Sequence, residues 1–132
     1  LGLAFQLRDD LMDFIATDVN AAKTVHQDFS CGYYTLPAIH TFAYPVCGEL
    51  LRKIAADLQS GVCCREEAAS EISKLIEDAD GYGYTMRLIR GYCEEAIRAL
   101  NVFRDSEAKQ CLKRIAESVC EGAEHLMDNY ML

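Results

Sequence analysis

Apolar residues recur at the 3.6-residue spacing of an α-helix along most of this 132-residue sequence. Leu3, Leu7, Leu11 and Phe14 show the pattern first and predict a helix over residues 1 to about 15. The same period predicts helices over residues 35–44, 48–61, 65–81, 84–103 and 106–127. No stretch alternates apolar and polar residues as a half-buried strand does. We therefore predict an all-α fold, an antiparallel helical bundle with short connections.

Residues that start or stop helices separate these segments. Thr35 predicts an N-cap, and Pro45 predicts the break after the helix that Thr35 begins. Ser106 predicts the cap of the last helix, whereas Gly81 predicts the stop of the helix over residues 65–81. Residues 17–34 lack a helical period and predict a loop or a frayed turn.

Length and charge limit the functions that this chain can have. The length fits one domain, a single all-helical region over residues 1–132. The formal net charge of −8 argues against a nucleic-acid partner, because phosphate backbones are held by clustered Lys and Arg. It permits a small phosphorylated ligand that is held through a divalent cation. No apolar run approaches the roughly 20 residues of a bilayer span, so we predict no membrane span.

The seven cysteines are scattered and contain no CxxC pair. An odd, dispersed set of this kind is typical of buried or half-buried thiols in a reducing compartment. We therefore expect free thiols and a cytoplasmic location.

An acidic cluster lies on the first predicted helix, in the stretch GLAFQLRDDLMDF over residues 2–14. On a helical wheel with Asp9 at zero, Asp13 falls near 40°, Gln6 near 60° and Asp10 near 100°. These four polar side chains share one arc, and the leucines of the helix lie roughly opposite. Phe5 and Met12 border the arc on its other edge.

Two interpretations of the arc remain open on spacing alone. An isolated DDxxD is commonly a solvated helix face, since short motifs match often by chance. Neighbouring Phe and Met side chains favour a cleft instead, and oxygen-only ligands select Mg²⁺, which typically lies between one or two carboxylates and substrate phosphates. Lys23, ten residues after Asp13, could bring a positive charge to such a phosphate.

Residues 2–37 resemble the trans-isoprenyl diphosphate synthases, also called polyprenyl synthetases. The stretch GLAFQLRDDLMDF looks like the second aspartate-rich motif of that family with its preceding Phe-Gln. Lys23, Asp28, Gly32 and the Thr-Leu-Pro at residues 35–37 then follow at the family's spacings. The match departs from the family at Ala22, where a glycine is usual, and at Tyr33, where a second basic residue usually stands.

The resemblance implies the isoprenoid synthase fold and head-to-tail prenyl transfer. In this reaction an allylic diphosphate, held by Mg²⁺ between two aspartate-rich helices, condenses with isopentenyl diphosphate. The product is longer by one five-carbon unit. Asp9 would be the leading metal ligand, and Asp10 and Asp13 would be further ligands or would hold the metal's waters.

The resemblance also implies roles in substrate binding. Gln6 would point its amide at the reacting end of the allylic chain, and Phe5 would line the cavity. Lys23 would pair with the diphosphate, and Asp28 would orient Lys23 or a metal-bound water.

The family's first aspartate-rich motif is not among these residues, so the chain looks like the C-terminal half of a polyprenyl synthetase domain. We expect this piece alone to lack prenyltransferase activity and the full-length protein to be a homodimer. One alternative is a non-catalytic partner subunit that keeps the fold. Another is a terpene cyclase, against which the register from Lys23 to residues 35–37 argues.

Overall fold

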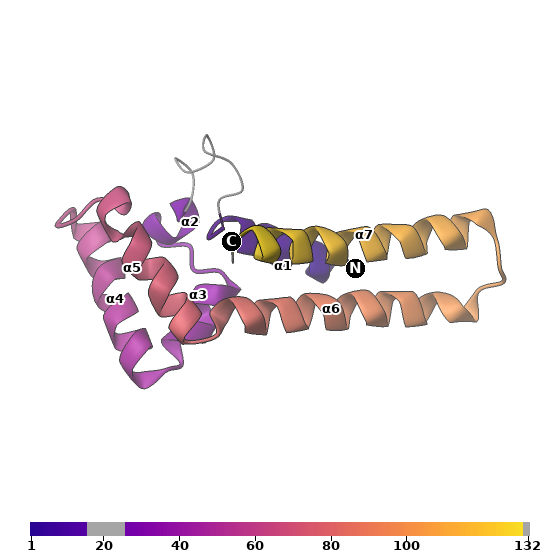
Figure 1. Ribbon diagram of the computed structural model, residues 1–132, viewed down its shortest axis with the longest axis horizontal. Coiled ribbons are helices and arrows are strands. Elements are labelled where there is room, and N and C mark those ends of the chain that lie inside the picture. The colour runs from indigo at the N-terminus through magenta and orange to yellow at the C-terminus, as the bar shows by residue number, and fades with distance from the viewer. Residues whose placement is uncertain (16–25, 131–132) are drawn as a thin grey trace.

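The computed structural model describes residues 1–15 and 26–130. In chain order its helical elements are α1 (Gly2–Met12), α2 (Gln27–Ser30), α3 (Leu36–Phe42), α4 (Pro45–Ser60), α5 (Arg65–Asp78), α6 (Gly81–Ala99), the 3₁₀ turn η2 (Leu100–Val102) and α7 (Glu107–Tyr130) (Figure 1). These described residues include no strand, so the prediction of an all-α fold is confirmed.

Helices α6 and α7 form a long antiparallel hairpin, and α1 packs against both of them (Figure 1). Helices α3, α4 and α5 gather at the end of the hairpin where α6 begins, and α2 packs against α4. The opposite end of the hairpin, where η2 leads into α7, extends past the start of α1. The end of α1 that carries the acidic residues therefore lies on the side of the α3–α5 group.

A cluster of aromatic side chains is centred on Phe14, two residues after the end of α1. Phe14 is buried, and its ring centroid lies 5.3 Å from that of His26 and 6.4 Å from those of Phe29 and Tyr82. The first two contacts are edge-on, which the charge distribution of aromatic rings favours. These contacts join α1, α2 and α6, so they fix where the acidic end of α1 stands.

The buried side of α1 differs from the expected side at one position. Ala4 and Leu11 are fully buried, whereas Leu3 is exposed. The prediction that Leu3 faces the core is therefore wrong. The row that packs against the hairpin runs from Ala4 to Leu11, and Leu3 falls about 20° from Asp10 on the wheel, at the edge of the acidic arc.

Most predicted helix boundaries agree with the structure. Thr35 is the N-cap of α3, which ends before Pro45, and Pro45 is the first residue of α4. The hydroxyl of Ser106 accepts a hydrogen bond of 3.2 Å from the Lys109 N–H at the start of α7. Of the loop or frayed turn predicted over residues 17–34, residues 17–25 lie outside the described residues, and the remainder contains the one-turn helix α2.

Gly81 begins a helix instead of ending one. Helix α5 is closed at Ala79, Asp80 takes a left-handed conformation with φ of 56°, and Gly81 starts α6. A Cβ at Gly81 would lie 2.8 Å from the Pro37 carbonyl oxygen and 2.8 Å from Cγ2 of Ile76. Glycine is required here because α6 starts in close contact with α3 and α5.

We expect Gly81→Ala to lower the free energy of unfolding by about 1–3 kcal/mol, since the new methyl group overpacks a backbone contact. Gly91, in the same helix, is the matched control, because a Cβ there would meet no atom within 4 Å. Gly91→Ala should instead raise the free energy by up to about 1 kcal/mol through helix propensity. Urea denaturation measures both, and equal effects of the two changes would contradict the close contact at Gly81.

All seven cysteines are free thiols, as expected. Their burial differs from the expectation, because Cys31, Cys64 and Cys111 are exposed and only Cys93 is fully buried. Among the helices of the described residues, none is both long enough and apolar enough to cross a bilayer.

Candidate active site

The acidic cluster lies at the C-terminal end of α1. Asp9 and Asp10 occupy its last turn, and Asp13 is its C-cap residue. The carbonyl groups at this end carry partial negative charge, so carboxylates here are unfavourable for the helix. The last turn contains no basic residue to offset them. Local helix stability therefore does not account for the three aspartates.

Two of the carboxylates have partners within α1. Oδ1 of Asp9 lies 3.2 Å from a guanidinium nitrogen of Arg8, and the Asp9 side chain remains 44% exposed. Oδ1 of Asp10 accepts a hydrogen bond of 2.9 Å from the amide of Gln6, four residues earlier. The amide that was predicted to face the substrate thus holds Asp10 in this structure.

Asp13 connects the acidic helix to the next element. Its Oδ1 accepts a hydrogen bond of 3.2 Å from the backbone N–H of Asp28, at the start of α2. Its backbone carbonyl accepts one of 2.6 Å from the N–H of His26. Oδ2 of Asp13 is buried and has no hydrogen-bond partner among the described residues. The fold therefore uses one carboxylate oxygen, and within the described part of the chain the other has no partner.

The environment of Asp13 disfavours its charge. Burial raises the pKa of Asp13, and the nearby carboxylate of Asp28 raises it further. Hydrogen bonds from the N–H groups at the start of α2 act in the opposite direction. A cation beside Oδ2 would stabilise the charged form. The geometry thus brings Asp28 next to Asp13.

Arg8 brings a positive charge into the cluster that the sequence analysis did not assign. Its guanidinium lies over the ring of Phe5, 4.3 Å from the ring centroid, besides its contact with Asp9. Its Nε is buried and has no hydrogen-bond partner in the part of the chain that the structure describes. The sequence signal for this contact was the spacing of Phe5 and Arg8, because side chains three residues apart are neighbours on the surface of a helix.

The apolar side chains that border the acidic arc are exposed to solvent. Phe5 and Met12 are both exposed on α1. The stretch of chain that the structure describes contains no group of three His, Cys, Asp or Glu side chains arranged to hold a metal ion. The donors fit the other mode of Mg²⁺ binding, in which one or two carboxylates share the ion with phosphate oxygens. Lys23 lies outside the described residues.

A buried histidine supports the turn behind Asp13. His26 is only 1% exposed and has a left-handed φ of 61°. Its Nε2 lies 3.1 Å from the hydroxyl of Ser73 on α5, and its Nδ1 is buried with no partner among residues 1–15 and 26–130. Burial lowers the pKa of His26 to about 4, and Arg65 contributes in the same direction. The imidazole is therefore neutral near pH 7.

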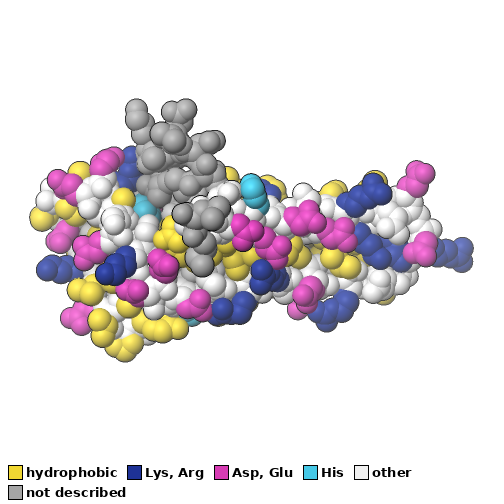
Figure 2. All heavy atoms as spheres, in the orientation of Figure 1, with side chains coloured by type: hydrophobic (Ala, Val, Ile, Leu, Met, Phe, Trp, Pro, Cys, Tyr) yellow, Lys and Arg dark blue, Asp and Glu magenta, His cyan; other side chains and the backbone are white. Residues whose placement is uncertain are grey.

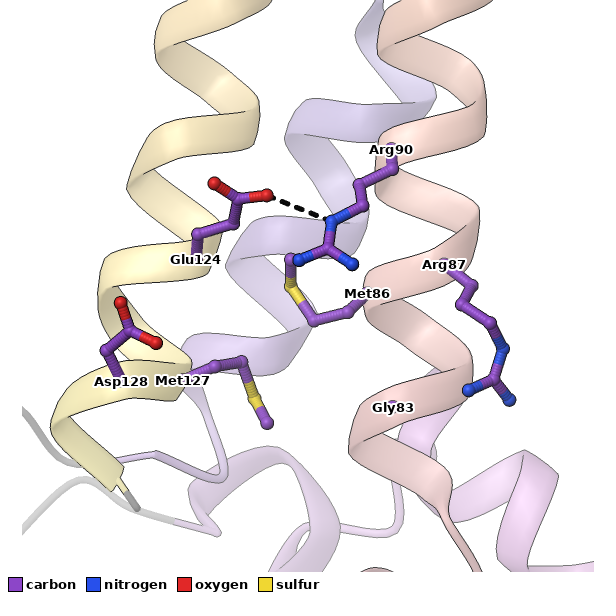
Figure 3. Close-up of a pocket in the computed structure, with 7 residues that line it drawn as sticks. All are labelled: Gly83, Met86, Arg87, Arg90, Glu124, Met127 and Asp128. Carbon is purple, nitrogen blue, oxygen red and sulfur yellow. Dashed lines mark hydrogen bonds and ion pairs between the residues drawn. The ribbon is translucent and has the colours of Figure 1, made fainter. Parts of the chain in front are cut away.

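A separate pocket of about 530 Å³ lies between α6 and α7 (Figure 3). Its lining residues include none of the predicted site residues and are Gly83, Met86, Arg87, Arg90, Glu124, Met127 and Asp128. Figure 3 shows Arg90 and Glu124 pointing toward each other from the two helices, and their ion pair is 2.9 Å long. Arg87 pairs at 2.7 Å with Asp80. With both arginines paired, the pocket offers no free cationic group for a diphosphate.

Comparisons with known proteins match most of the chain, including its N-terminal part. A family model described as polyprenyl synthetase matches residues 1–74, which include α1 and its aspartates. No solved structure gave a significant match.

Three curated relatives match most of the chain. A probable mitochondrial hexaprenyl pyrophosphate synthase of Neurospora crassa is 33% identical over 116 residues, which are 88% of this chain and 24% of that protein. The octaprenyl diphosphate synthase of Haemophilus influenzae is 29% identical over 88% of this chain and 34% of its own. Component 2 of the heptaprenyl diphosphate synthase of Bacillus subtilis is 25% identical over 90% and 32%. The chain thus spans a quarter to a third of the length of these relatives.

Proposed function

The chain belongs to the polyprenyl synthetase family, and from this premise we propose that it supplies one acidic wall of a trans-prenyltransferase active site. The proposed reaction condenses an allylic diphosphate with isopentenyl diphosphate, head to tail. Diphosphate leaves the allylic carbon, the double bond of isopentenyl diphosphate attacks it, and loss of a proton completes a chain with five more carbons. The observation that carries this proposal is the acidic end of α1, where one carboxylate oxygen of Asp13 has no partner among the residues that the structure describes.

Asp9 and Asp13 would hold Mg²⁺, with Asp10 as a further ligand or as a partner of the metal's waters. These oxygen donors fit the ion, and the unpartnered Oδ2 of Asp13 supports the fit. Bound there with the diphosphate, Mg²⁺ would offset the negative charge that develops on the leaving group.

Basic and amide side chains of this chain would complete the contacts to the diphosphate. Arg8, already beside Asp9, is positioned to add positive charge at the same edge of α1. Lys23 is proposed to pair with the diphosphate on the strength of its place in the motif. Gln6 would exchange its bond with Asp10 for the reacting end of the allylic substrate. The contribution of such groups is charge stabilisation where charge develops.

Asp28 and Phe5 would act at the two borders of the site. Asp28 lies next to Asp13 and would orient Lys23 or a metal-bound water. Phe5, exposed on α1, would line the cavity and keep water from the reacting carbon once the prenyl chain covers it.

We further propose that this chain is the C-terminal half of a longer synthase, which would be a homodimer in the cytoplasm. The short coverage of the relatives supports a longer parent. The 132-residue chain alone should then fail to elongate an allylic diphosphate, because it carries only one of the two acidic walls.

A second candidate is a non-catalytic partner subunit. The name of the Bacillus subtilis relative designates one component of a synthase, which supports the existence of such two-part enzymes. Tyr33, which stands where the family usually has a second basic residue, is 71% exposed and adds no positive charge.

The test is elongation of farnesyl diphosphate by labelled isopentenyl diphosphate, with the complete enzyme. We expect products longer by five-carbon units when Mg²⁺ is present and none after chelation with EDTA, with recovery when Mg²⁺ is restored. The complete protein could instead give no product alone and restore product when it is mixed with a partner subunit that is also inactive alone. This result would support the non-catalytic subunit and contradict the first candidate. Elongation that persists in EDTA would contradict the role of Mg²⁺.

A further inference from the structure

The free end of the α6–α7 hairpin differs in charge from the rest of the chain. We call residues 98–114 the hairpin tip. It contains five basic residues and two acidic ones, although the whole chain has a formal net charge of −8. Figure 2 shows dark-blue Lys and Arg side chains at this end of the molecule. The hairpin tip therefore carries a net positive formal charge on an otherwise strongly acidic protein.

Part of this charge is used to build the loop of the tip. Lys109 is nine-tenths buried, and its Nζ donates hydrogen bonds of 2.9 Å to the Phe103 carbonyl and of 2.9 Å to the Asp105 carboxylate. The backbone N–H of Phe103 also bonds the Leu100 carbonyl at 3.1 Å. The loop thus has a defined shape that keeps the side chain of Phe103 outside the core.

The remaining basic side chains surround an apolar apex. Val102 is 83% exposed and Phe103 is 62% exposed, and Val102 is the most exposed large apolar side chain of the described residues. Arg98 and Arg104, one on each side of them in the chain, are exposed as well. Leu112, on α7, is exposed as well.

We propose that the hairpin tip docks on an anionic lipid surface. Val102 and Phe103 enter the interface, where an aromatic ring and a branched aliphatic side chain lose their contact with water. Arg98 and Arg104 then lie at the level of the lipid phosphates and gain charge-assisted contacts. The acidic remainder of the chain is repelled from the same surface, so the hairpin meets the membrane with its free end.

The shape of the tip favours a lipid surface over a protein partner. A stable protein interface buries roughly 800 Å² on each side, which calls for a broad face. The apex offers two large side chains on a narrow loop, and Figure 1 shows no other described helix beside it. The charge pattern also selects an anionic partner, whereas an apolar protein groove would leave the basic residues without counterparts.

This proposal does not depend on prenyl transfer, because it uses none of the residues of α1. It would place the free end of the hairpin on the membrane and leave the acidic end of α1 at the opposite side of the bundle (Figure 1). A failure of the elongation assay would leave the lipid proposal untouched, and the reverse also holds.

The chain contains no tryptophan, so Phe103→Trp introduces a single indole at the apex. Its emission should shift to the blue, and be quenched by brominated lipid, with phosphatidylcholine vesicles that contain phosphatidylglycerol. Vesicles of phosphatidylcholine alone should give binding weaker by about tenfold or more. Val62→Trp is the matched control, since Val62 is 74% exposed in the loop between α4 and α5, and its emission should not change.

Vesicle sedimentation of four variants measures separately how the basic and the apolar side chains of the hairpin tip contribute to lipid binding. Val102→Asp and Arg104→Glu should each reduce binding to anionic vesicles about tenfold. The controls Val62→Asp and Lys53→Glu alter equally exposed residue types away from the tip and should bind as the parent does. Circular dichroism verifies the same helix content in all four.

Three results would overturn the proposal. The first is equal binding to neutral and anionic vesicles, and the second is an equal loss in Val62→Asp and Val102→Asp. The third is a change in molar mass, by light scattering, on Val102→Asp with no change in vesicle binding, which would identify the apex as a contact between protein chains.

Discussion

In the complete enzyme, Asp9→Asn is expected to lower kcat/KM for isopentenyl diphosphate by about a thousandfold or more, equivalent to about 4 kcal/mol of transition-state stabilisation. The amide keeps the size of the side chain and removes the charge that would hold Mg²⁺. Asp9 is the most exposed carboxylate of the cluster, and among the described residues its ion-pair partner is Arg8, so the change should leave the fold intact.

The matched control is Asp78→Asn, an equally conservative change at an exposed aspartate of α5. It should retain the parent's rate, and both variants should unfold at the parent's denaturant midpoint. If Asp9→Asn turns over at the control's rate, Asp9 has no role in metal binding. A drop in rate that accompanies a lower midpoint would assign the effect to folding instead.

The free energy of unfolding is expected to fall by about 3 kcal/mol, through His26 alone, as the pH decreases from about 6.5 to 4. The pKa of His26 is about 4 in the folded protein and 6.5 in its ordinary state. Between these values the unfolded chain binds a proton that the folded chain does not, so acidification favours unfolding. Above pH 6.5 both states are neutral and the contribution of His26 vanishes.

Other carboxylates titrate in the same range, so the measurement is a comparison with His26→Asn. Asn tolerates the left-handed backbone of this position and carries no titrating group. Urea midpoints collected from pH 4 to 8 should show a steeper loss at low pH for the parent than for the variant. Parallel curves would mean that the imidazole is accessible to protons in the folded state.

The helical architecture was predictable because its signals are local. The 3.6-residue period and residues such as Thr35, Pro45 and Ser106 act within one or two turns, and the structure confirms them. The Asp-rich stretch and the resemblance it carries were likewise contained in a short segment, and the family match over residues 1–74 confirms the family.

What the sequence did not reveal depends on contacts between distant residues. Helix α2 is a single turn whose first N–H groups are bound by Asp13, fifteen residues earlier in the chain. His26 gives no periodic signal, yet it is buried against Ser73 on another helix. Gly81 looks like a helix stop until Pro37 is placed beside it. The role of Arg8 became visible only with the ring of Phe5 under its guanidinium.

Asp13 connects the formation of the turn that starts α2 with the binding of a cation, two processes that are usually independent. Its Oδ1 closes the turn that starts α2, and its buried Oδ2 has no hydrogen-bond partner among the described residues. A cation that draws this carboxylate toward itself must lengthen or realign the bond to the Asp28 N–H. Cation binding at Asp13 and the ordering of residues 26–30 are therefore thermodynamically linked. Each changes the equilibrium constant of the other by the same factor. The rate of hydrogen exchange at the backbone amide of Asp28 would therefore report whether a cation is bound at the acidic end of α1.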